Sequence, residues 1–186
     1  MKNTKFILKL AAILFAIAFI CTLLLVLCNE MTKDRIAALQ AEAENAAKSE
    51  VLPEADSFED TMTENVVAAY IGKKDGETVG YCLKVEPSGF GGGISMIVGI
   101  NTERVVTGVK ITNMTETPGL GAKASDEIWL GQFVGKNSDI SVVKTGNAKD
   151  NQINAISGAT VTSKAVAKGV NDALAAADKI MEKEGK

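Results

Sequence analysis

The chain has 186 residues, of which 46% are hydrophobic and 23% are charged, and its formal net charge is −3 at pH 7. This length accommodates one modest domain with accessory segments. The slight negative charge leaves no excess of Lys and Arg to hold a phosphate backbone, so nucleic acid is excluded as a partner. The sequence contains no histidine, which excludes Ser-His-Asp and Cys-His catalysis as well as haem or zinc bound through histidine.

Three cysteines are present, Cys21, Cys28 and Cys82. Their spacing fits neither a disulfide framework nor a zinc or iron–sulfur site. Cys21 and Cys28 are seven residues apart in an apolar run, and we interpret them as apolar side chains that face lipid or a partner. We therefore expect no metal site, no catalytic residue of the chain's own, and chemistry that depends on a bound cofactor.

Residues 10–28 form an apolar run, LAAILFAIAFICTLLLVLC, without a charge. As a helix they span about 28 Å, close to the roughly 30 Å of a bilayer's hydrocarbon core. A buried core helix, a cleaved signal peptide and a lipoprotein signal are the alternatives. The bulky residues Val26 and Leu27 before Cys28 do not suit either kind of signal, which carries small residues there. The run is interpreted as an uncleaved transmembrane anchor.

The direction of the anchor follows from the lysines before it. Lys2, Lys5 and Lys9 lie in residues 1–9, which contain no acidic residue. Positive residues flanking a membrane span remain on the cytoplasmic side. We expect residues 1–9 in the cytoplasm, a single pass through the cell (inner) membrane, and an extracytoplasmic main domain.

The segment after the anchor has the composition of a helix. Residues 29–52 are rich in Ala, Glu and Gln, with Ile36 and Leu39 at helical spacing, and they predict a helical stalk. Pro53 ends the stalk, and the acidic residues 54–60 predict a loop.

The main domain, residues 53–186, combines strand and helix patterns. A helix is expected from an N-cap at Ser125 to Gly135, and a long amphipathic helix from Ser163 to Glu182. The fold class is therefore α+β, an antiparallel sheet with packed helices behind a single N-terminal transmembrane helix. The expected strands are 66–71, 78–85, 94–100, 105–111 and 140–144.

A hydroxyl-rich segment precedes the last helix. Small residues surround Thr160, and its hydroxyl lies near a helix N-terminus, where free backbone N–H groups favour a phosphate. An ordinary Ser/Thr capping sequence, with Gly158 in the turn, explains the same pattern. The segment is Ser157-Gly158-Ala159-Thr160-Val161-Thr162-Ser163.

This segment resembles the flavinylation motif of the FMN-binding domain family, which includes the G subunit of the Rnf complex and the C subunit of the sodium-pumping NADH:quinone oxidoreductase. The resemblance implies that Thr160 carries FMN covalently through a phosphoester, attached by a magnesium-dependent flavin transferase. Thr162 and Ser163 match the motif's later hydroxyls, which implies capping or phosphate contact. The family usually has an acidic residue where this chain has Asn154, with Asp150 a partial substitute.

A second stretch supports the resemblance. It is similar to the family's Glu-Thr-Pro-Gly-Leu-Gly stretch, although an ordinary Pro-Gly turn is the alternative. Pro118 fixes the chain, while Gly119 and Gly121 allow backbone to approach a flat ring. Leu120 is expected to pack on the isoalloxazine, and Glu116 to bond polar ring or ribityl atoms. The expected cofactor-binding residues here are Glu116, Thr117, Pro118, Gly119, Leu120 and Gly121.

A glycine-rich stretch completes the pattern. Residues 89–94 are similar to the segment ahead of the family's central strand, and they lack the GxGxxG spacing of a dinucleotide fold. The chain's brevity favours the G subunit of the Rnf complex. The resemblance implies an electron-relay subunit of an ion-translocating ferredoxin:NAD oxidoreductase, a translocase, whose partners are other Rnf subunits, especially integral-membrane ones.

Two other functions remain open from the sequence. The first is still redox chemistry, either the quinone-reductase C subunit or a stand-alone extracytoplasmic flavin carrier. The second is a membrane-anchored interaction domain without a cofactor, in which Thr160 only caps a helix. Covalent flavin at Thr160 distinguishes the redox functions from the last.

Overall fold

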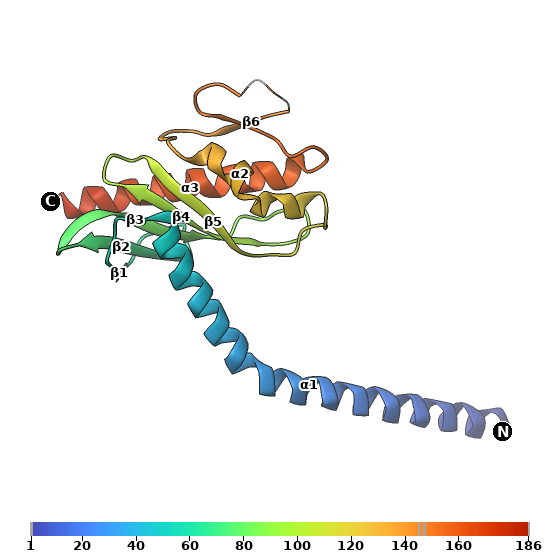
Figure 1. Ribbon diagram of the computed structural model, residues 1–186. Helices are drawn as coiled ribbons and strands as arrows, with labels where there is room; N and C mark the ends of the chain where they lie inside the picture. The colour runs from blue at the N-terminus through green and yellow to red at the C-terminus, as the bar shows by residue number, and fades with distance from the viewer. Residues whose placement is uncertain (1, 145, 147, 186) are drawn as a thin grey trace. The chain divides into compact units, whose positions relative to one another are not determined.

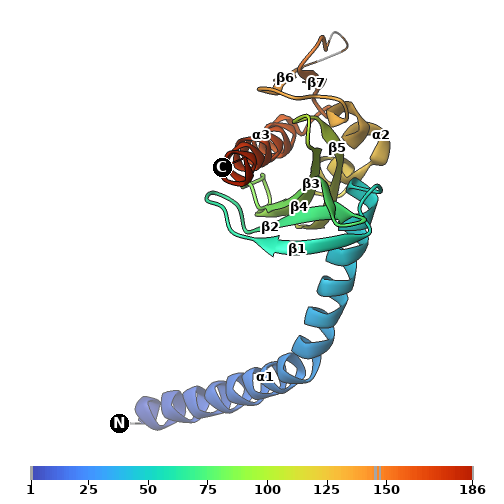
Figure 2. The same cartoon turned by 90° about the vertical axis from the view of Figure 1, so that its left-hand side faces the viewer.

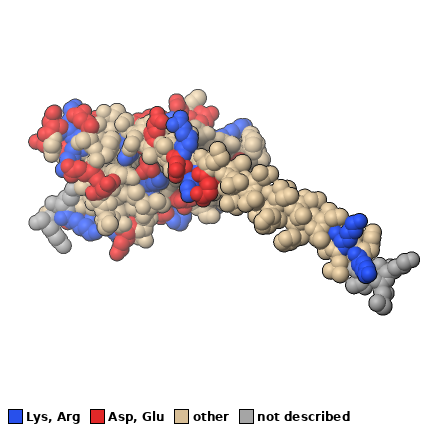
Figure 3. Space-filling model, turned by 90° about the horizontal axis from the view of Figure 1, so that it is seen from below, with Lys and Arg blue, Asp and Glu red and all other residues tan. Residues whose placement is uncertain are grey.

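The computed structural model describes residues 2–144, 146 and 148–185, and the chain divides into two units, residues 1–42 and 43–186. Helix α1 (Lys2–Val51) begins in the first unit and ends in the second (Figure 1). In the described residues it is the one helix long and apolar enough to cross a membrane. Figure 3 shows its apolar span in tan, with basic side chains near the N-terminal end. The predicted long N-terminal apolar helix is confirmed.

Residues 43–186, here called the sheet unit, are built on a five-stranded antiparallel sheet in the order β1-β2-β3-β4-β5. Because spatial order equals sequence order, each strand pairs with the next by a simple reversal. Asp75 and Gly76 form the two-residue turn between β2 and β3, both with positive φ, as such hairpins require. The strands are β1 Ser57–Thr61, β2 Ala68–Lys74, β3 Glu77–Val85, β4 Ile94–Asn101 and β5 Val106–Met114.

Strand β1 lies where the sequence predicted an acidic loop, so that prediction is wrong. Glu59 and Asp60 have low strand propensity. An edge strand needs a partner on one side only, however, and β1 pairs with β2 along its whole length. Glu59 also forms an ion pair with Lys73 of β2 at 2.7 Å. Tertiary pairing therefore overrides local propensity here.

Helix α3 (Thr160–Glu184) packs against one face of the sheet, and Figure 2 shows it nearly end-on. Its apolar stripe is buried as the sequence predicted, which confirms the α+β fold class. Full burial of these side chains makes the contact of α3 with β3 and β4 the centre of the hydrophobic core. The main core residues are Leu83, Met96, Val98 and Ile100 from the sheet and Val166, Val170, Ala173 and Ala177 from α3.

The short elements between β5 and α3 differ from the predicted helix. The observed α-helix has Asp126 as its N-cap, and the Asp126 side chain accepts a hydrogen bond from Ile128 N. Ser125, the predicted N-cap, is the last residue of the preceding 3-10 helix. The α-helical part is one turn long and continues as a 3-10 helix, whose last residue, Phe133, is buried in the core. The elements are η1 Gly121–Ser125, α2 Glu127–Leu130, η2 Gly131–Phe133, and the parallel pair β6 Ser141–Val143 and β7 Gln152–Asn154.

The other face of the sheet receives the C-terminal end of α1, which belongs to the sheet unit from Ala43 onward. A Cβ atom at Gly99 would overlap the Val51 carbonyl, and one at Gly108 would lie 2.9 Å from the Val51 Cα. Thr107 donates its hydroxyl hydrogen to the same carbonyl at 2.5 Å. The helix end thus rests directly on strand backbone. The glycines involved, here called the glycine row, are Gly72, Gly80, Gly99 and Gly108 on β2 to β5.

Cys82 on β3 faces the same helix end and is fully buried. Its thiol donates to the Lys48 carbonyl, with 3.8 Å between sulfur and oxygen. Burial raises the pKa of the Cys82 thiol to about 12, against the opposing charge of Lys48. The thiol is therefore protonated at neutral pH and unreactive.

A cluster of charges also holds this helix end. Glu44 accepts hydrogen bonds from the Lys84 ammonium and, at 2.5 Å, from the Tyr70 hydroxyl. The Lys48 ammonium lies 4.0 Å from the centre of the Tyr70 ring, a cation–π contact. Burial acts to raise the pKa of Glu44, but these hydrogen bonds and the nearby lysines outweigh it and lower the pKa below 4.5.

We expect this cluster to make the sheet unit sensitive to acid. A carboxyl whose pKa is lowered by folding stabilises the fold above its unfolded-state pKa, and this stability is lost as pH falls through the lower folded-state value. At pH 7, Glu44→Gln should reduce the free energy of unfolding by about 1.5–3 kcal/mol, as for a hydrogen bond to a charged group. Urea unfolding from pH 7 to pH 3 should show this difference shrinking below pH 4.5; a constant difference would contradict the assignment.

Candidate functional site

A cavity of about 380 Å³ opens beside the N-terminus of α3. Three segments that are far apart in the sequence contribute to its wall, namely the glycine-rich loop at Phe90, residues 116–121 and residues 158–162. The fold therefore brings both predicted cofactor segments to one place. The lining residues are Phe90, Glu116, Thr117, Leu120, Gly121, Gly158, Ala159, Thr160, Val161 and Thr162.

Thr160 is the first residue of α3 and is partly exposed on the cavity wall. The N-cap is Ala159, and no side chain caps the helix. The alternative of an ordinary Ser/Thr capping sequence is therefore not found, nor is the capping role that was one of the two given for Thr162 and Ser163. The first backbone N–H groups remain available to an anion. Gly158 has φ +78°, and this left-handed turn directs the chain into the helix.

Three large apolar side chains surround the cavity, Phe90, Leu120 and Val161, and they are 74%, 45% and 53% exposed. Single exposed apolar residues are ordinary on protein surfaces. Three on the wall of one cavity form a patch suited to a flat apolar ring. Leu120 was predicted for this contact, whereas Phe90 and Val161 were not. The sequence does indicate them, since Phe90 is the apolar residue within the glycine-rich stretch and Val161 is a large apolar residue within the Thr160 motif.

Glu116 is buried in the wall, with 8% of its surface exposed. Its Oε1 accepts hydrogen bonds from the backbone N–H of Phe90 at 2.7 Å and of Gly91 at 3.1 Å. Its Oε2 accepts from the Thr162 hydroxyl at 3.0 Å. The carboxylate was expected to bond the polar atoms of a cofactor. In the protein itself, its hydrogen bonds join the three segments that form the cavity.

The glycines of residues 116–121 also serve the protein itself. A Cβ atom at Gly121 would overlap the Glu116 carboxylate and the Thr162 hydroxyl, so its absence makes room for that hydrogen bond. Gly119 has φ +77° and nothing within 4 Å of its Cβ position, so it is needed for the turn. These roles differ from the close approach to a ring that was predicted. Pro118 and Gly119 are not among the lining residues.

Ser163 is fully buried behind the cavity. Its hydroxyl donates to the Ala159 carbonyl and accepts from Ile156 N, both at 2.9 Å. It therefore fixes the turn before α3. Because this hydroxyl is buried and already bonded, it is poorly placed for the predicted phosphate contact. Ser157 is exposed beside this turn and is not a lining residue either.

Asn154 stands where the resemblance implied an acidic residue. Its backbone N–H donates to Gln132 Oε1 and its carbonyl accepts from Trp129 Nε1, each at 2.8 Å. Its side-chain oxygen is buried and has no hydrogen-bond partner in the described part of the chain. Asp150 has φ +46°, and its carbonyl accepts from the Lys136 ammonium at 2.5 Å. Asn154 is thus part of the packing between β7 and α2.

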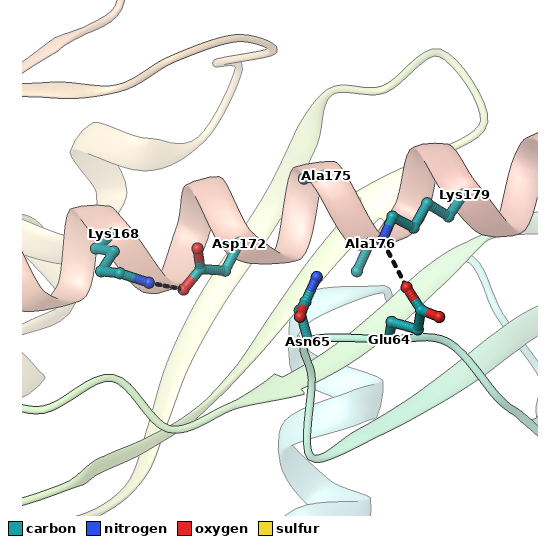
Figure 4. Close-up of a pocket in the computed structure, with 7 residues that line it drawn as sticks. All are labelled: Glu64, Asn65, Lys168, Asp172, Ala175, Ala176 and Lys179. Carbon is teal, nitrogen blue, oxygen red and sulfur yellow. Dashed lines mark hydrogen bonds and ion pairs between the residues drawn. The ribbon is translucent and has the colours of Figure 1, made fainter.

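A second cavity of the same volume, about 380 Å³, lies along α3 (Figure 4). Its charged residues pair with one another, Lys168 with Asp172 at 2.5 Å and Lys179 with Glu64 at 3.1 Å. It presents small alanines where the first cavity presents large apolar side chains. The lining, rather than the volume, therefore identifies the Thr160 cavity as the candidate site.

Comparison with known proteins defines the class first. Residues 89–175 match the family model described as "FMN-binding domain", and residues 1–51 match "RnfG N-terminal region". Among solved structures, the C subunit of the Na(+)-translocating NADH-quinone reductase from Parabacteroides distasonis is similar, with a TM-score of 0.52 and 25% identity over 61% of this chain and 62% of that one. The sheet unit accordingly contains an FMN-binding domain, which the family model matches over residues 89–175.

Curated relatives then give the particular family. The chain is 40% identical over 187 residues to the G subunit of the Na(+)-translocating ferredoxin:NAD(+) oxidoreductase complex of Acetobacterium woodii, covering 90% of this chain and 89% of the relative. It is 33% identical over 195 residues to the G subunit of the ion-translocating oxidoreductase complex of Methanosarcina acetivorans, covering all of both. The chain belongs to the family of Rnf-complex G subunits.

The cavity residues fit FMN. The exposed apolar side chains of Phe90, Leu120 and Val161 suit the isoalloxazine ring. The free N–H groups at the start of α3 suit a phosphate, with a dipole contribution of about 0.3–1 kcal/mol. This contribution positions a phosphate without being able to retain the cofactor by itself, which leaves a role for the Thr160 hydroxyl.

Proposed function

We propose that this chain is an electron-relay subunit of a membrane-bound, Rnf-type ion-translocating ferredoxin:NAD oxidoreductase, and that it carries FMN in a phosphoester with the Thr160 hydroxyl. The observation that supports this most directly is the position of Thr160 on the wall of the cavity that Phe90, Leu120 and Val161 also line. FMN, when bound, supplies the capacity to accept and pass on electrons. The chain has no reaction of its own to catalyse.

The residues of the chain would bind and orient the cofactor. Thr160 would retain the phosphate, and the first turn of α3 would stabilise its charge. Phe90, Leu120 and Val161 would cover the ring and exclude water from it. A covalent tether keeps the local concentration of the cofactor high where free FMN is scarce.

Attachment is proposed to need a separate flavin transferase. Activating the Thr160 hydroxyl requires a base within hydrogen-bond reach. Glu116 is the titratable side chain among the described lining residues, and its oxygens already accept bonds from Phe90, Gly91 and Thr162. It is thus poorly placed to remove a proton from Thr160.

The membrane arrangement is proposed from α1. Residues 10–28 would form the transmembrane anchor, residues 1–9 the cytoplasmic N-terminus and residues 29–52 the stalk. Lysines before the span and the absence of acidic residues there support an inward N-terminus. The FMN-binding domain, residues 53–186, would then lie outside the cytoplasm, with integral-membrane Rnf subunits as its partners.

Intact-mass measurement tests the proposed function. The chain produced together with a flavin transferase should gain the mass of FMN minus water, and peptide mapping should place the increment on the peptide containing Thr160. The labelled chain should also co-purify with integral-membrane Rnf subunits produced together with it. A colourless chain of unaltered mass would overturn the redox function, and labelled chain that purifies alone would favour a stand-alone carrier.

A further inference from the structure

Glu116 joins all three segments that line the cavity. Building on the FMN site proposed above, we propose that Glu116 is a positioning residue for the flavin: it fixes the cavity wall around the ring and places a negative charge beside it. The Glu116 clamp, as we call it, consists of Glu116, the backbone N–H groups of Phe90 and Gly91, and the hydroxyl of Thr162.

One side of the clamp holds the glycine-rich loop. Four of the five residues 89–93 are glycines, and glycine has the largest backbone entropy to lose on ordering. Two N–H groups of this loop converge on Glu116 Oε1, and the Thr115 hydroxyl donates to the Gly91 carbonyl at 3.1 Å. These bonds fix the backbone that carries the exposed Phe90 ring.

The other side of the clamp holds the first turn of α3. Thr162 is 1% exposed, so its hydroxyl is directed into the protein and bonds Glu116. It lies two residues after Thr160 on the same helical turn. The clamp therefore fixes the distance between the attachment point and Phe90 through one carboxylate.

The carboxylate also brings charge to the cavity. No Lys or Arg is found among the lining residues that the described chain provides. Reduction of flavin adds negative charge to the ring, and a fixed negative charge nearby disfavours it. Glu116 is therefore expected to lower the reduction potential of the bound FMN. Glu116 acts by fixing the cavity wall and through the electrostatic field of its charge, without a hydrogen bond to the ring.

The test begins with the full-length chain in detergent, produced without transferase and so without FMN. Hydrogen exchange at the Phe90 and Gly91 amides should become about tenfold faster or more in Glu116→Ala, the loss expected for a hydrogen bond to a charged acceptor. In Glu116→Gln the exchange should stay close to wild type, because the amide oxygen still accepts. Unchanged exchange in Glu116→Ala would overturn the clamp.

The same variants are then loaded with FMN. Glu116→Gln should shift the reduction potential to a more positive value, whereas an unchanged or more negative potential would overturn the charge effect. Thr162→Val should weaken the visible circular dichroism of the flavin, and Thr162→Ser should restore it; equal spectra for all three would overturn the positioning role.

These outcomes are separable from those of the proposed function. The proposed function is tested by the mass of the wild-type chain, and the clamp is tested by amide exchange in the unloaded chain. If wild type itself gains no mass, the proposed function fails, while the exchange measurement on unloaded chain still decides whether the clamp exists. Should Glu116→Ala not fold, Glu116→Gln and the Thr162→Val and Thr162→Ser pair provide the test.

Discussion

Thr160→Ala is expected to abolish FMN attachment, although it changes a partly exposed residue whose loss costs the fold little. A phosphoester needs an alcohol oxygen at this point on the cavity wall, and alanine has none. Two other hydroxyls line the cavity. That of Thr162 is buried and bonded to Glu116, and that of Thr117 lies on a different segment, residues 116–121.

Denaturing gels under ultraviolet light measure this directly, because a covalent flavin stays with the unfolded chain. The fluorescent band should be lost in Thr160→Ala and kept in Thr117→Ala and Thr162→Ala. Thr160→Ser, which retains the alcohol, should be labelled. A band that remains bright in Thr160→Ala would move the attachment to another residue.

Gly99→Ala and Gly108→Ala are expected to destabilise the sheet unit strongly for the addition of one methyl group. The new Cβ would meet the backbone of Val51, which cannot turn aside as a flexible side chain can. Overpacking of this kind costs about 1–3 kcal/mol. The end of α1 would have to lift from the sheet, with loss of the hydrogen bond from Thr107 to the Val51 carbonyl.

Gly131→Ala is the matched control. Gly131 has helical backbone angles and nothing within 4 Å of its Cβ position, so alanine should be neutral or slightly stabilising. Urea unfolding of the three variants in detergent provides the comparison. If Gly99→Ala were as stable as Gly131→Ala, direct contact between the helix end and strand backbone would be disproved.

Much of this fold could be predicted from local pattern. The apolar stripe of α3 and the apolar run of α1 each depend on residues close together in the sequence, and each was predicted. Strand β1 was not predicted, because its acidic residues are strand-forming only beside β2. The short helix after η1 was predicted with the wrong cap, since Ser125 and Asp126 are equally good candidates locally.

The candidate site divides in the same way. Thr160 and residues 116–121 were selected by motif, and the fold brings them to one cavity. The roles of Glu116, Gly121 and Thr162 were not predicted, because each depends on which distant atom occupies the space beside it. The glycine row was overlooked for the same reason: nothing near Gly99 or Gly108 in the sequence indicates that Val51 rests on them.

The burial of Cys82 offers an experimental opportunity. It is the sole thiol after residue 28, and because it is fully buried we expect it to react with neither oxidants nor alkylating reagents while the sheet unit is folded. A single cysteine introduced on that unit's surface would then be its only reactive handle for a spin label, a fluorophore or a photocrosslinker. The folded sheet unit thus has no accessible thiol of its own that would compete with the introduced cysteine when its contacts with neighbouring subunits are mapped.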